Sequence, residues 1–460
     1  MRYLMIPLLF VLSIMSAGAD EKEDSVISFM GLKVNRHDTS WDDYNPERGF
    51  FQKAYSDKSD PRFMIANEDE TFEFGIGGVL RMTAFEDFGG ATNHKGFSTW
   101  HISVPTDYAH NVGINVMSSR VFFKSKVKFG RKRLISYIEL SANDQEQIGL
   151  NQAYFSYGGF SVGKTHSFFE DLAAGVQTVD LKGPNTSISK CHALIGYTFD
   201  FGRHFILGMA AEQPDYATTE YQNLGIYSEY QNLPDFAARF VWKGDFGHLQ
   251  ASGLVRSLSY WTFNRPMSQV TVSNSDGTSK HVLGWGVSLS GRFNLTPQCF
   301  LTFQSIYGKG IQQYINDFSN VGMDLVPTRV NKDTDEQYYK MRALPAWGGY
   351  LGFQYNWNRK LTTSAVLGMV GMDNHKVQTF SWEKSSYSDY VNDCNLYDYR
   401  YASYLALSTF YHLNDYCTVG AEYLNGMRCQ RERDYDTMTL TGESNHGVAN
   451  RFNLMFSYSF

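Results

Sequence analysis

The sequence predicts an all-β fold, a transmembrane antiparallel β-barrel of about sixteen strands. Its first support is periodicity, because apolar residues alternate with small or polar residues along segments of about ten residues. The second is the pattern of connections, in which short turns alternate with long polar loops. The third is aromatic content: the 34 Phe, 30 Tyr and 8 Trp residues include Phe72, Phe129, Trp242, Trp357 and Tyr458 near strand ends, where membrane-interface girdles lie.

The composition excludes other classes of protein. With 11 Pro and 19% charged residues, the chain is too aromatic and too weakly charged to be disordered. After residue 19, no run approaches the roughly 18 consecutive apolar residues of a membrane-spanning helix. A net charge of −6 without a dense basic run lacks the electrostatic footprint of phosphate binding, so no nucleic-acid partner is expected.

The first residues predict export. Arg2 precedes an apolar run that ends near Met15, and Ala17 and Ala19 come before the charged residues 20–23. This pattern is typical of a signal peptide, residues 1–19, cleaved after Ala19. The 5 cysteines are few and odd in number, and none follows the cleavage site directly. They indicate neither a lipid anchor, nor a disulfide framework, nor a zinc site, and no metal or cofactor is expected.

The remaining chain divides into two parts. Residues 20–71 are charged and unpatterned, so we expect a polar periplasmic or plug-like segment, and residues 72–460 are expected to form the barrel. Alternating segments begin near residues 72, 116, 133, 149, 159, 189, 203, 235, 247, 281, 298, 346, 360, 399, 416 and 448. A barrel of about eighteen strands stays open. Long loops are predicted at 86–115, 167–188, 214–233, 257–280, 308–345 and 373–398.

Soluble sandwiches and propellers also alternate polar and apolar residues. The aromatic strand ends, the lack of a blade-length repeat and a chain that finishes on its last strand at Phe460 favour the barrel instead. A membrane barrel must close its last strand against its first, because lipid cannot satisfy an open edge.

Several motifs carry a resemblance to a known family. The last strand, with Phe452, Phe456, Tyr458 and Phe460, is similar to the sorting signal of Gram-negative outer-membrane proteins, which the barrel-assembly machinery reads. Residues 77–81 with 86–90, residues 118–123 and residues 162–171 resemble, in order, the first strand, the second strand and the start of the third loop of DcaP-like trimeric porins. The resemblance covers roughly residues 62–260, more loosely to the end.

The resemblance implies a cell outer-membrane location among lipid and lipopolysaccharide, a homotrimer, an inward-folded third loop and passive diffusion of small solutes, for some members carboxylated ones. Lys164 and His166 stand where the family usually has Gln and Trp, and the N-terminal segment lacks the coiled-coil pattern of some members.

With apolar positions facing lipid, the alternate positions face the lumen. The predicted wall is basic, although the chain is acidic, and rings of Arg and Lys favour anions. If the third loop folds inward, its acids would face these cations and set a transverse field. The predicted pore-lining residues are Arg81, Arg120, Lys124, Lys126, Arg239, Arg256 and Arg428 on the wall, and Lys164, His166, Glu170 and Asp171 at the loop. Lys128 is better explained as part of a solvated rim.

The sequence therefore predicts a diffusion channel that favours small anions such as carboxylates. An outer-membrane barrel enzyme, of the phospholipase or protease kind, would need a nucleophile motif or converging Ser, His and Asp residues, and none stands out. We therefore expect no enzymatic activity. A structural or adhesive barrel with partner-binding loops stays open, and conductance would separate the three classes.

Overall fold

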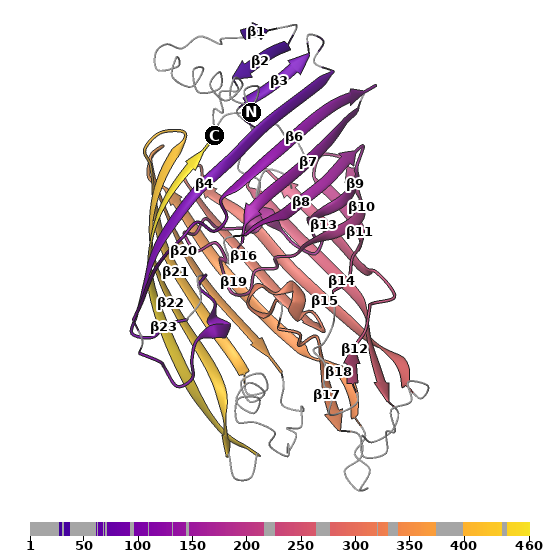
Figure 1. Cartoon of the computed structure of the whole chain (residues 1–460), viewed down its shortest axis with the longest axis vertical. Helices are drawn as coiled ribbons and strands as arrows, with labels where there is room; N and C mark the ends of the chain where they lie inside the picture. Colours follow the sequence, from indigo (N-terminus) through magenta and orange to yellow (C-terminus); the bar gives the residue numbers. More distant parts are fainter. Residues whose placement is uncertain are drawn as a thin grey trace, which may run out of the picture.

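A closed antiparallel sheet dominates the structure, a computed structural model (Figure 1). The structure describes residues 27–29, 32–36, 61, 63–67, 69, 71–92, 96–108, 110–130, 132–143, 147–215, 226–263, 277–319, 321–329, 339–373, 399–434 and 439–460. The sheet has 21 strands, of which sixteen form the closed barrel. The predicted fold class and the count of sixteen are confirmed. The predicted signal peptide lies outside the described residues.

Each wall strand pairs with the next one along the chain, and the last pairs with the first. The wall consists of β4 (Phe72–Phe88), β6 (Arg120–Phe129), β7 (Lys132–Ala142), β8 (Ile148–Tyr157), β9 (Phe160–His166), β10 (Cys191–Phe201), β11 (Phe205–Glu212), β13 (Asp235–Gly244), β14 (Gly247–Phe263), β15 (Gly277–Thr296), β16 (Cys299–Lys309), β19 (Pro345–Asn356), β20 (Leu361–Met372), β21 (Tyr399–His412), β22 (Cys417–Asp434) and β23 (Thr439–Ser459).

Three strands are longer than predicted. The expected loop at 257–280 is strand at both of its ends, because β14 runs to Phe263 and β15 begins at Gly277. Likewise, β23 begins at Thr439 rather than near residue 448. In β14 the cause is burial on the inner face, where Leu258 and Tyr260 pack against loops that fold into the barrel.

The two faces of the wall differ as the alternation predicts. Leu80, Val287 and Leu454 point outward, with 56%, 51% and 50% of their surface exposed. Their neighbours point inward and are covered, as Ser288 and Asn453 are. Among the described residues, no helix is long and apolar enough to cross a bilayer.

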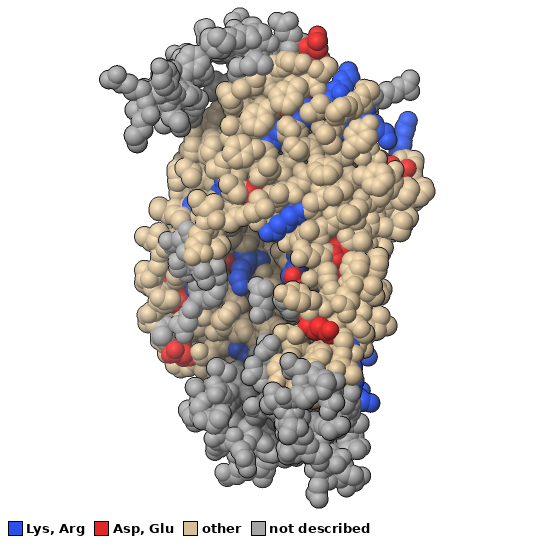
Figure 2. All heavy atoms as spheres, turned by 45° about the vertical axis from the view of Figure 1, so that its right-hand side comes forward, with Lys and Arg blue, Asp and Glu red and all other residues tan. Residues whose placement is uncertain are grey.

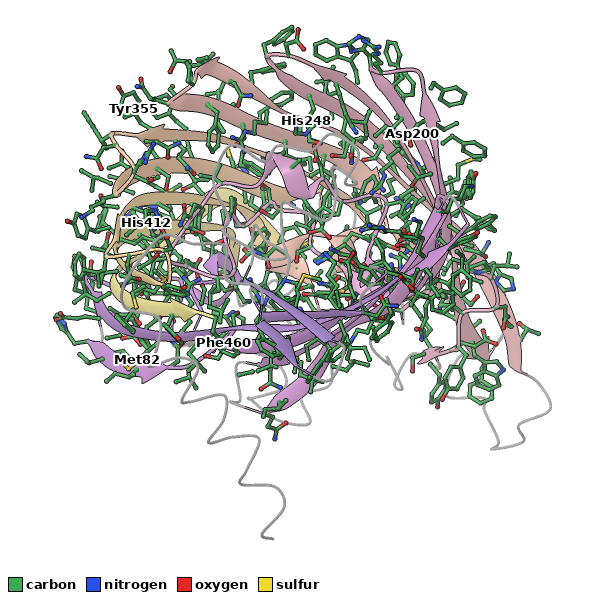
Figure 3. The ribbon with its side chains drawn as sticks, turned by 90° about the horizontal axis from the view of Figure 1, so that it is seen from above. Met82, Asp200, His248, Tyr355, His412 and Phe460 are labelled. Carbon is green, nitrogen blue, oxygen red and sulfur yellow. The ribbon has the colours of Figure 1, made fainter. Side chains whose placement is uncertain are left out.

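The barrel closes at a seam between β4 and β23, where Met82 pairs with Phe456 (Figure 3, which labels Met82 and Phe460). The backbone N–H groups of Gly78 and Phe460 donate to each other's carbonyl oxygens, both at 3.0 Å. A Cβ on Gly78 would lie 2.5 Å from Cζ of Phe460, so the aromatic ring can cover this strand only because residue 78 is glycine. The C-terminal residue is thus part of the seam.

Three strands of the N-terminal segment extend the same sheet. They are β1 (Ile27–Phe29), β2 (Leu32–Arg36) and β3 (Phe63–Asn67), and β3 pairs with the first residues of β4. In Figure 1 they stand at the end of the barrel where the C-terminus lies. The segment 20–71 therefore has strands that its composition did not predict, while its periplasmic location stays a prediction.

Three loops fold into the barrel from the opposite end. The first follows β4 and carries η1 (Thr99–His101); the second, residues 167–190, carries η2 (Leu172–Ala174); the third, within 310–344, carries η6 (Gln312–Tyr314), η7 (Asn316–Phe318), β17 (Leu325–Arg329) and β18 (Tyr339–Ala343). The first loop ends at β5 (Asn111–Asn115), which pairs with β4 in line with β6 and so lies in the wall. A further short strand, β12 (Ile226–Ser228), pairs with β14. The main apolar cluster lies between these loops and the inner wall, for example Phe169 and Phe318 with Leu254. The inward fold of the loop after β9 is confirmed.

Candidate functional site

The loop at residues 167–190 lies along the inner wall, and we call it the belt. Its start is fixed by Glu212 on β11, whose carboxylate accepts hydrogen bonds from Ser167 Oγ and the Phe168 N–H, both at 2.7 Å. His192 Nε2 lies 2.8 Å from the same carboxylate. These partners replace the water that the buried carboxylate has lost, so Glu212 anchors the start of the belt.

Asp171 is the next anchor. Its carboxylate lies 2.9 Å from His248 Nε2 on β14 and accepts from Ser290 Oγ on β15 at 2.6 Å (Figure 3 labels His248). It also accepts from the Ala173 N–H at 3.1 Å and so caps η2. Burial opposes ionisation, but the bonds from His248 and Ser290 outweigh it and lower the pKa of Asp171.

The tip of the belt reaches the wall beside the seam. The backbone N–H groups of Val179 and Asp180 donate to Glu422 on β22, and Arg81 on β4 donates to the Val179 carbonyl. The Asp180 carboxyl accepts from Tyr404 at 3.2 Å, and burial raises the pKa of Asp180. The belt therefore spans the interior from β11 to β4.

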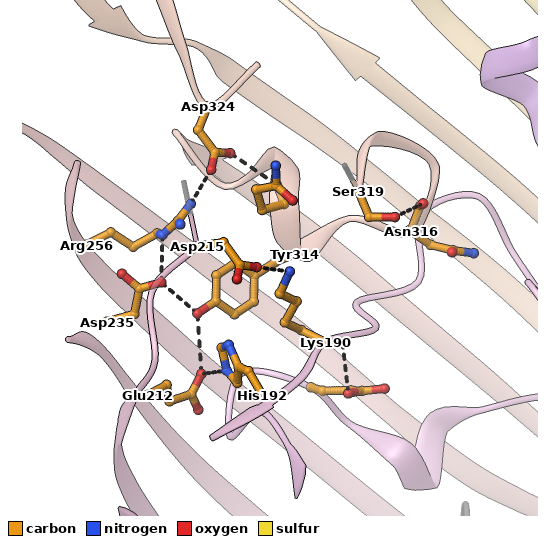
Figure 4. Close-up of polar contacts among 12 residues, drawn as sticks. Lys190, His192, Glu212, Asp215, Asp235, Arg256, Tyr314, Asn316, Ser319 and Asp324 are labelled. Atoms are coloured by element: carbon orange, nitrogen blue, oxygen red, sulfur yellow. Dashed lines mark hydrogen bonds and ion pairs between the residues drawn. The ribbon is translucent and has the colours of Figure 1, made fainter. Parts of the chain in front are cut away.

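Arg256 was predicted to line the pore, and the structure corrects this. It is fully buried, with Nε 2.9 Å from Asp235 and Nη1 2.6 Å from Asp324 (Figure 4). Tyr314 donates to the same Asp235 at 2.9 Å and lies 3.4 Å from Glu212. Arg256 faces inward as expected, but the third inner loop supplies Asp324 and covers it. Its role is to fasten that loop to the wall.

Arg239 and Arg428 are corrected for the same reason. Both face inward, and only 8% and 6% of their surfaces are exposed. Arg239 lies over the ring of Phe168 in the belt, 4.0 Å from its centre. Arg428 donates to the Trp100 carbonyl at 2.5 Å and lies 5.0 Å from the Trp100 ring centre, so the first inner loop covers it.

The cations predicted on β6 are on the inner face, and we call Arg120, Lys124 and Lys126 the basic ladder. Arg120 lies 3.8 Å from Glu139, and 22% of its side chain is exposed. Lys126 lies 3.5 Å from Glu73, and Lys124 is half-buried in register with Gly75 and Tyr137. Arg120 and Lys126 thus pair with acids of the wall, whereas Asp171 of the belt pairs with His248.

Lys164 and His166, two further predicted pore-lining residues, lie on β9 rather than on β6. Lys164 pairs with Ala153 and Ala193, on the face that also carries the exposed Phe155 and Ile195, so it points outward. Paired residues in an antiparallel sheet share a face, which corrects the pore-lining prediction for Lys164. That prediction came from the place of Lys164 in the motif at 162–171, whereas the register of β9 determines the direction in which its side chain points.

His166 ends the same strand, and its Nδ1 lies 3.0 Å from the Glu170 carboxylate. Glu170 and Asp171, the two residues before η2, thus each have a histidine partner: His166 for Glu170 and His248 for Asp171. Both acids are buried against these histidines, and a transverse field between the loop's acids and the wall cations stays a prediction.

The predicted sorting-signal residues lie on the closing strand. Phe452 and Phe456 point outward with 41% and 43% exposed, and the rings of Tyr458 and Phe460 stack with centres 6.1 Å apart. In the described part of the chain, no group of His, Cys, Asp and Glu is arranged to hold a metal ion.

The basic ladder lies on the inner face of β6, and the belt lies along the inner faces of other strands. Figure 2 shows a hollow in one face with Lys and Arg side chains inside it. Asp235, Asp324 and Tyr314, which fasten the third inner loop, were missed from the sequence. Asp324 and Tyr314 lie in a long loop without a pattern that could have revealed them.

The comparisons with known proteins agree with this geometry. A family profile described as a porin subfamily matches residues 81–406. The fold is similar to the outer membrane channel DcaP of Acinetobacter baumannii, with a TM-score of 0.64 and 17% identity over 86% of this chain and 99% of that chain. It is also similar to OmpT, an outer membrane protein of Vibrio cholerae, with a TM-score of 0.50 and 11% identity over 85% of this chain and 98% of that chain. No curated protein matches the chain.

Proposed function

This chain belongs to the porin subfamily, and from that membership we propose that its barrel is a passive diffusion channel for small hydrophilic solutes that favours anions such as carboxylates. As a porin it belongs to the outer membrane, and its family and fold are those of a channel rather than an enzyme.

The basic ladder is the observation that carries the anion preference. The inner faces of β6 and β7 hold Arg120, Lys124, Lys126 and Arg133, and the acids bonded to them are Glu139 and Glu73. Cations therefore outnumber acids on this stretch. A partly exposed guanidinium and ammonium can replace some of the water around a carboxylate, which lowers the barrier for anions.

The acids on the opposite side contribute less to the field in the lumen. Asp235 and Asp324 both pair with Arg256, which offsets one of their two charges, and Asp171 faces His248. Because Arg120 and Lys124 are the partly exposed members of the ladder, whereas Lys126 is buried beside Glu73, these two side chains carry the electrostatic preference.

Liposome swelling tests this proposal. Vesicles that hold the purified protein should swell faster in a dicarboxylate than in a diamine of similar length, and Lys124→Glu should reduce the ratio. Lys360→Glu, in the exposed turn between β19 and β20, makes the same charge change away from the lumen and should leave the ratio unchanged. Equal swelling in both solutes would refute the anion preference. No swelling at all would favour the structural or adhesive barrel.

The proposal includes the biogenesis and assembly expected from the sequence. Residues 1–19 direct export and are cleaved, the barrel-assembly machinery reads the strand that ends in Phe460, and the folded barrels form a homotrimer in lipid and lipopolysaccharide. Native mass spectrometry of the detergent-solubilised protein should give the mass of three mature chains. A monomer mass would contradict the trimer.

A further inference from the structure

The tip of the belt is held by a single buried carboxylate. Glu422 is 1% exposed, and its two oxygens accept from the Val179 N–H at 2.7 Å and the Asp180 N–H at 2.6 Å. Ser408 Oγ and Asn453 Nδ2 donate to the same carboxylate at 2.6 and 3.1 Å. Four donors replace its hydration, so the carboxylate is both satisfied and fixed in position.

A second side chain holds the same residue of the belt from another strand. Arg81 on β4 donates through Nη2 to the Val179 carbonyl at 2.5 Å. The N–H of Val179 is therefore held by β22 and its carbonyl by β4, and β23 lies between these two strands. The peptide groups of the tip are clamped across the closing seam of the barrel.

The side chain of Val179 occupies a socket in the wall. It is 1% exposed and packs with Phe410 and Met455. A Cβ on Gly420 would lie 2.9 Å from Cγ2 of Val179, which is closer than packed carbons approach. The missing side chain at Gly420 makes the room for Val179.

We propose that Glu422, Arg81 and Gly420 form a latch that fixes the tip of the belt to the seam and thereby sets the width of the channel. They are positioning residues, because they act through the belt. In the β4–β6 register, Val79 on β4 pairs with Arg120 of the ladder, two residues from Arg81. The latched tip therefore lies beside the basic ladder, where a displaced belt would change the space open to solutes. This role of the latch rests on the proposed channel function.

The rate of amide hydrogen exchange at Val179 and Asp180 measures directly how firmly the latch holds the tip. In the full-length trimer, a peptide that covers Val179 and Asp180 should exchange slowly. Glu422→Gln places an amide donor against one of the two N–H groups, so exchange should be faster by on the order of tenfold, the effect of one charge-assisted hydrogen bond. Glu86→Gln is the matched control, because Glu86 points outward on β4 and is exposed.

Gly420→Ala tests the socket without changing a charge. The added methyl should expel Val179, with faster exchange at the tip. Val179→Ala in the Gly420→Ala chain removes the clashing Cγ2 and should restore slow exchange. A purely structural defect at β22 would not be rescued by this second change in the loop.

Single-channel recordings on the same variants connect the latch to width. Glu422→Gln and Gly420→Ala should raise conductance and admit larger polyethylene glycols, whereas Glu86→Gln and the rescued double variant should match the wild type. Faster exchange with unchanged conductance and cut-off would overturn the role in width. Unchanged exchange in both variants would overturn the latch itself. If the wild type does not conduct, the proposed channel function fails, and the exchange data still decide whether the tip is latched.

Discussion

Replacing Arg256 with methionine should release the third inner loop from the wall. Methionine keeps most of the buried volume, but it leaves the carboxylates of Asp235 and Asp324 without their guanidinium partner. The side chains of all three residues are 1% exposed or less. Removing one partner of a buried ion pair costs about 3–5 kcal/mol, because the remaining charge stays desolvated. A loss of about 4 kcal/mol lowers the docking constant of the loop by about a thousandfold.

Limited trypsin digestion measures this loss. Lys340 and Arg342 lie on β18 of the docked loop, and cleavage of a transiently opened segment follows the population of the open form. Arg256→Met should therefore be cut far faster at these sites than the wild type. Arg359→Met, in the exposed turn between β19 and β20, is the matched control and should be cut like the wild type.

A triple variant separates charge from packing. Adding Asp235→Asn and Asp324→Asn to Arg256→Met removes every charge of the cluster, and neutral replacement of a buried ion pair is often close to neutral in stability. Cleavage should then slow again. The reasoning is refuted if Arg256→Met is cut like the wild type, or if the triple variant is cut as fast as the single one.

Three further predictions concern other anchors. Because the pKa of Asp171 is lowered in the folded protein, its carboxylate contributes fully to the stability of the docked belt above the ordinary pKa of 3.8, and this contribution is lost as the pH falls through the lowered pKa. Hydrogen exchange of the Ala173 N–H should therefore become faster only in that acid range. In Asp171→Asn the same N–H should exchange fast at neutral pH too. Gly78→Val should reduce the yield of the folded, heat-modifiable form, because its side chain would meet the Phe460 ring, and a normal yield would argue against the tight seam. Arg451→Leu leaves the buried Asp87 unpaired and should lower the free energy of unfolding by about 3–5 kcal/mol in guanidinium titrations, with no shift in the midpoint as the contrary result.

The alternation predicted the barrel because its cause is local. Each strand meets lipid on one face and the interior on the other, so apolar residues recur at every second position of each strand. In β23 the outward residues are Phe452, Leu454 and Phe456. The strand beginnings follow within a few residues, except that of β23. The extra length of β14 was missed because its last residues meet an inner loop, not water, and polarity alone does not distinguish the two.

The site was predicted less completely, because alternation gives the face of a residue and not what covers it. Arg239, Arg256 and Arg428 do face inward, as expected. Their cover comes from loops distant in sequence: Asp324, for example, is 68 residues from Arg256. No periodic pattern records such docking. The basic ladder was found because β6 is an alternating strand, and Arg120 and Lys124 are partly exposed on its inner face.

The reversal potential of the channel tests the central claim most directly. The purified protein would be placed in a planar bilayer between two concentrations of potassium chloride, and the potential at zero current would be measured. We expect the sign that indicates selectivity for chloride, with a shift toward zero when Lys124 and Lys126 are replaced by glutamine. A potential of the opposite sign, or one that these replacements leave unchanged, would contradict the assignment of anion selectivity to the basic ladder.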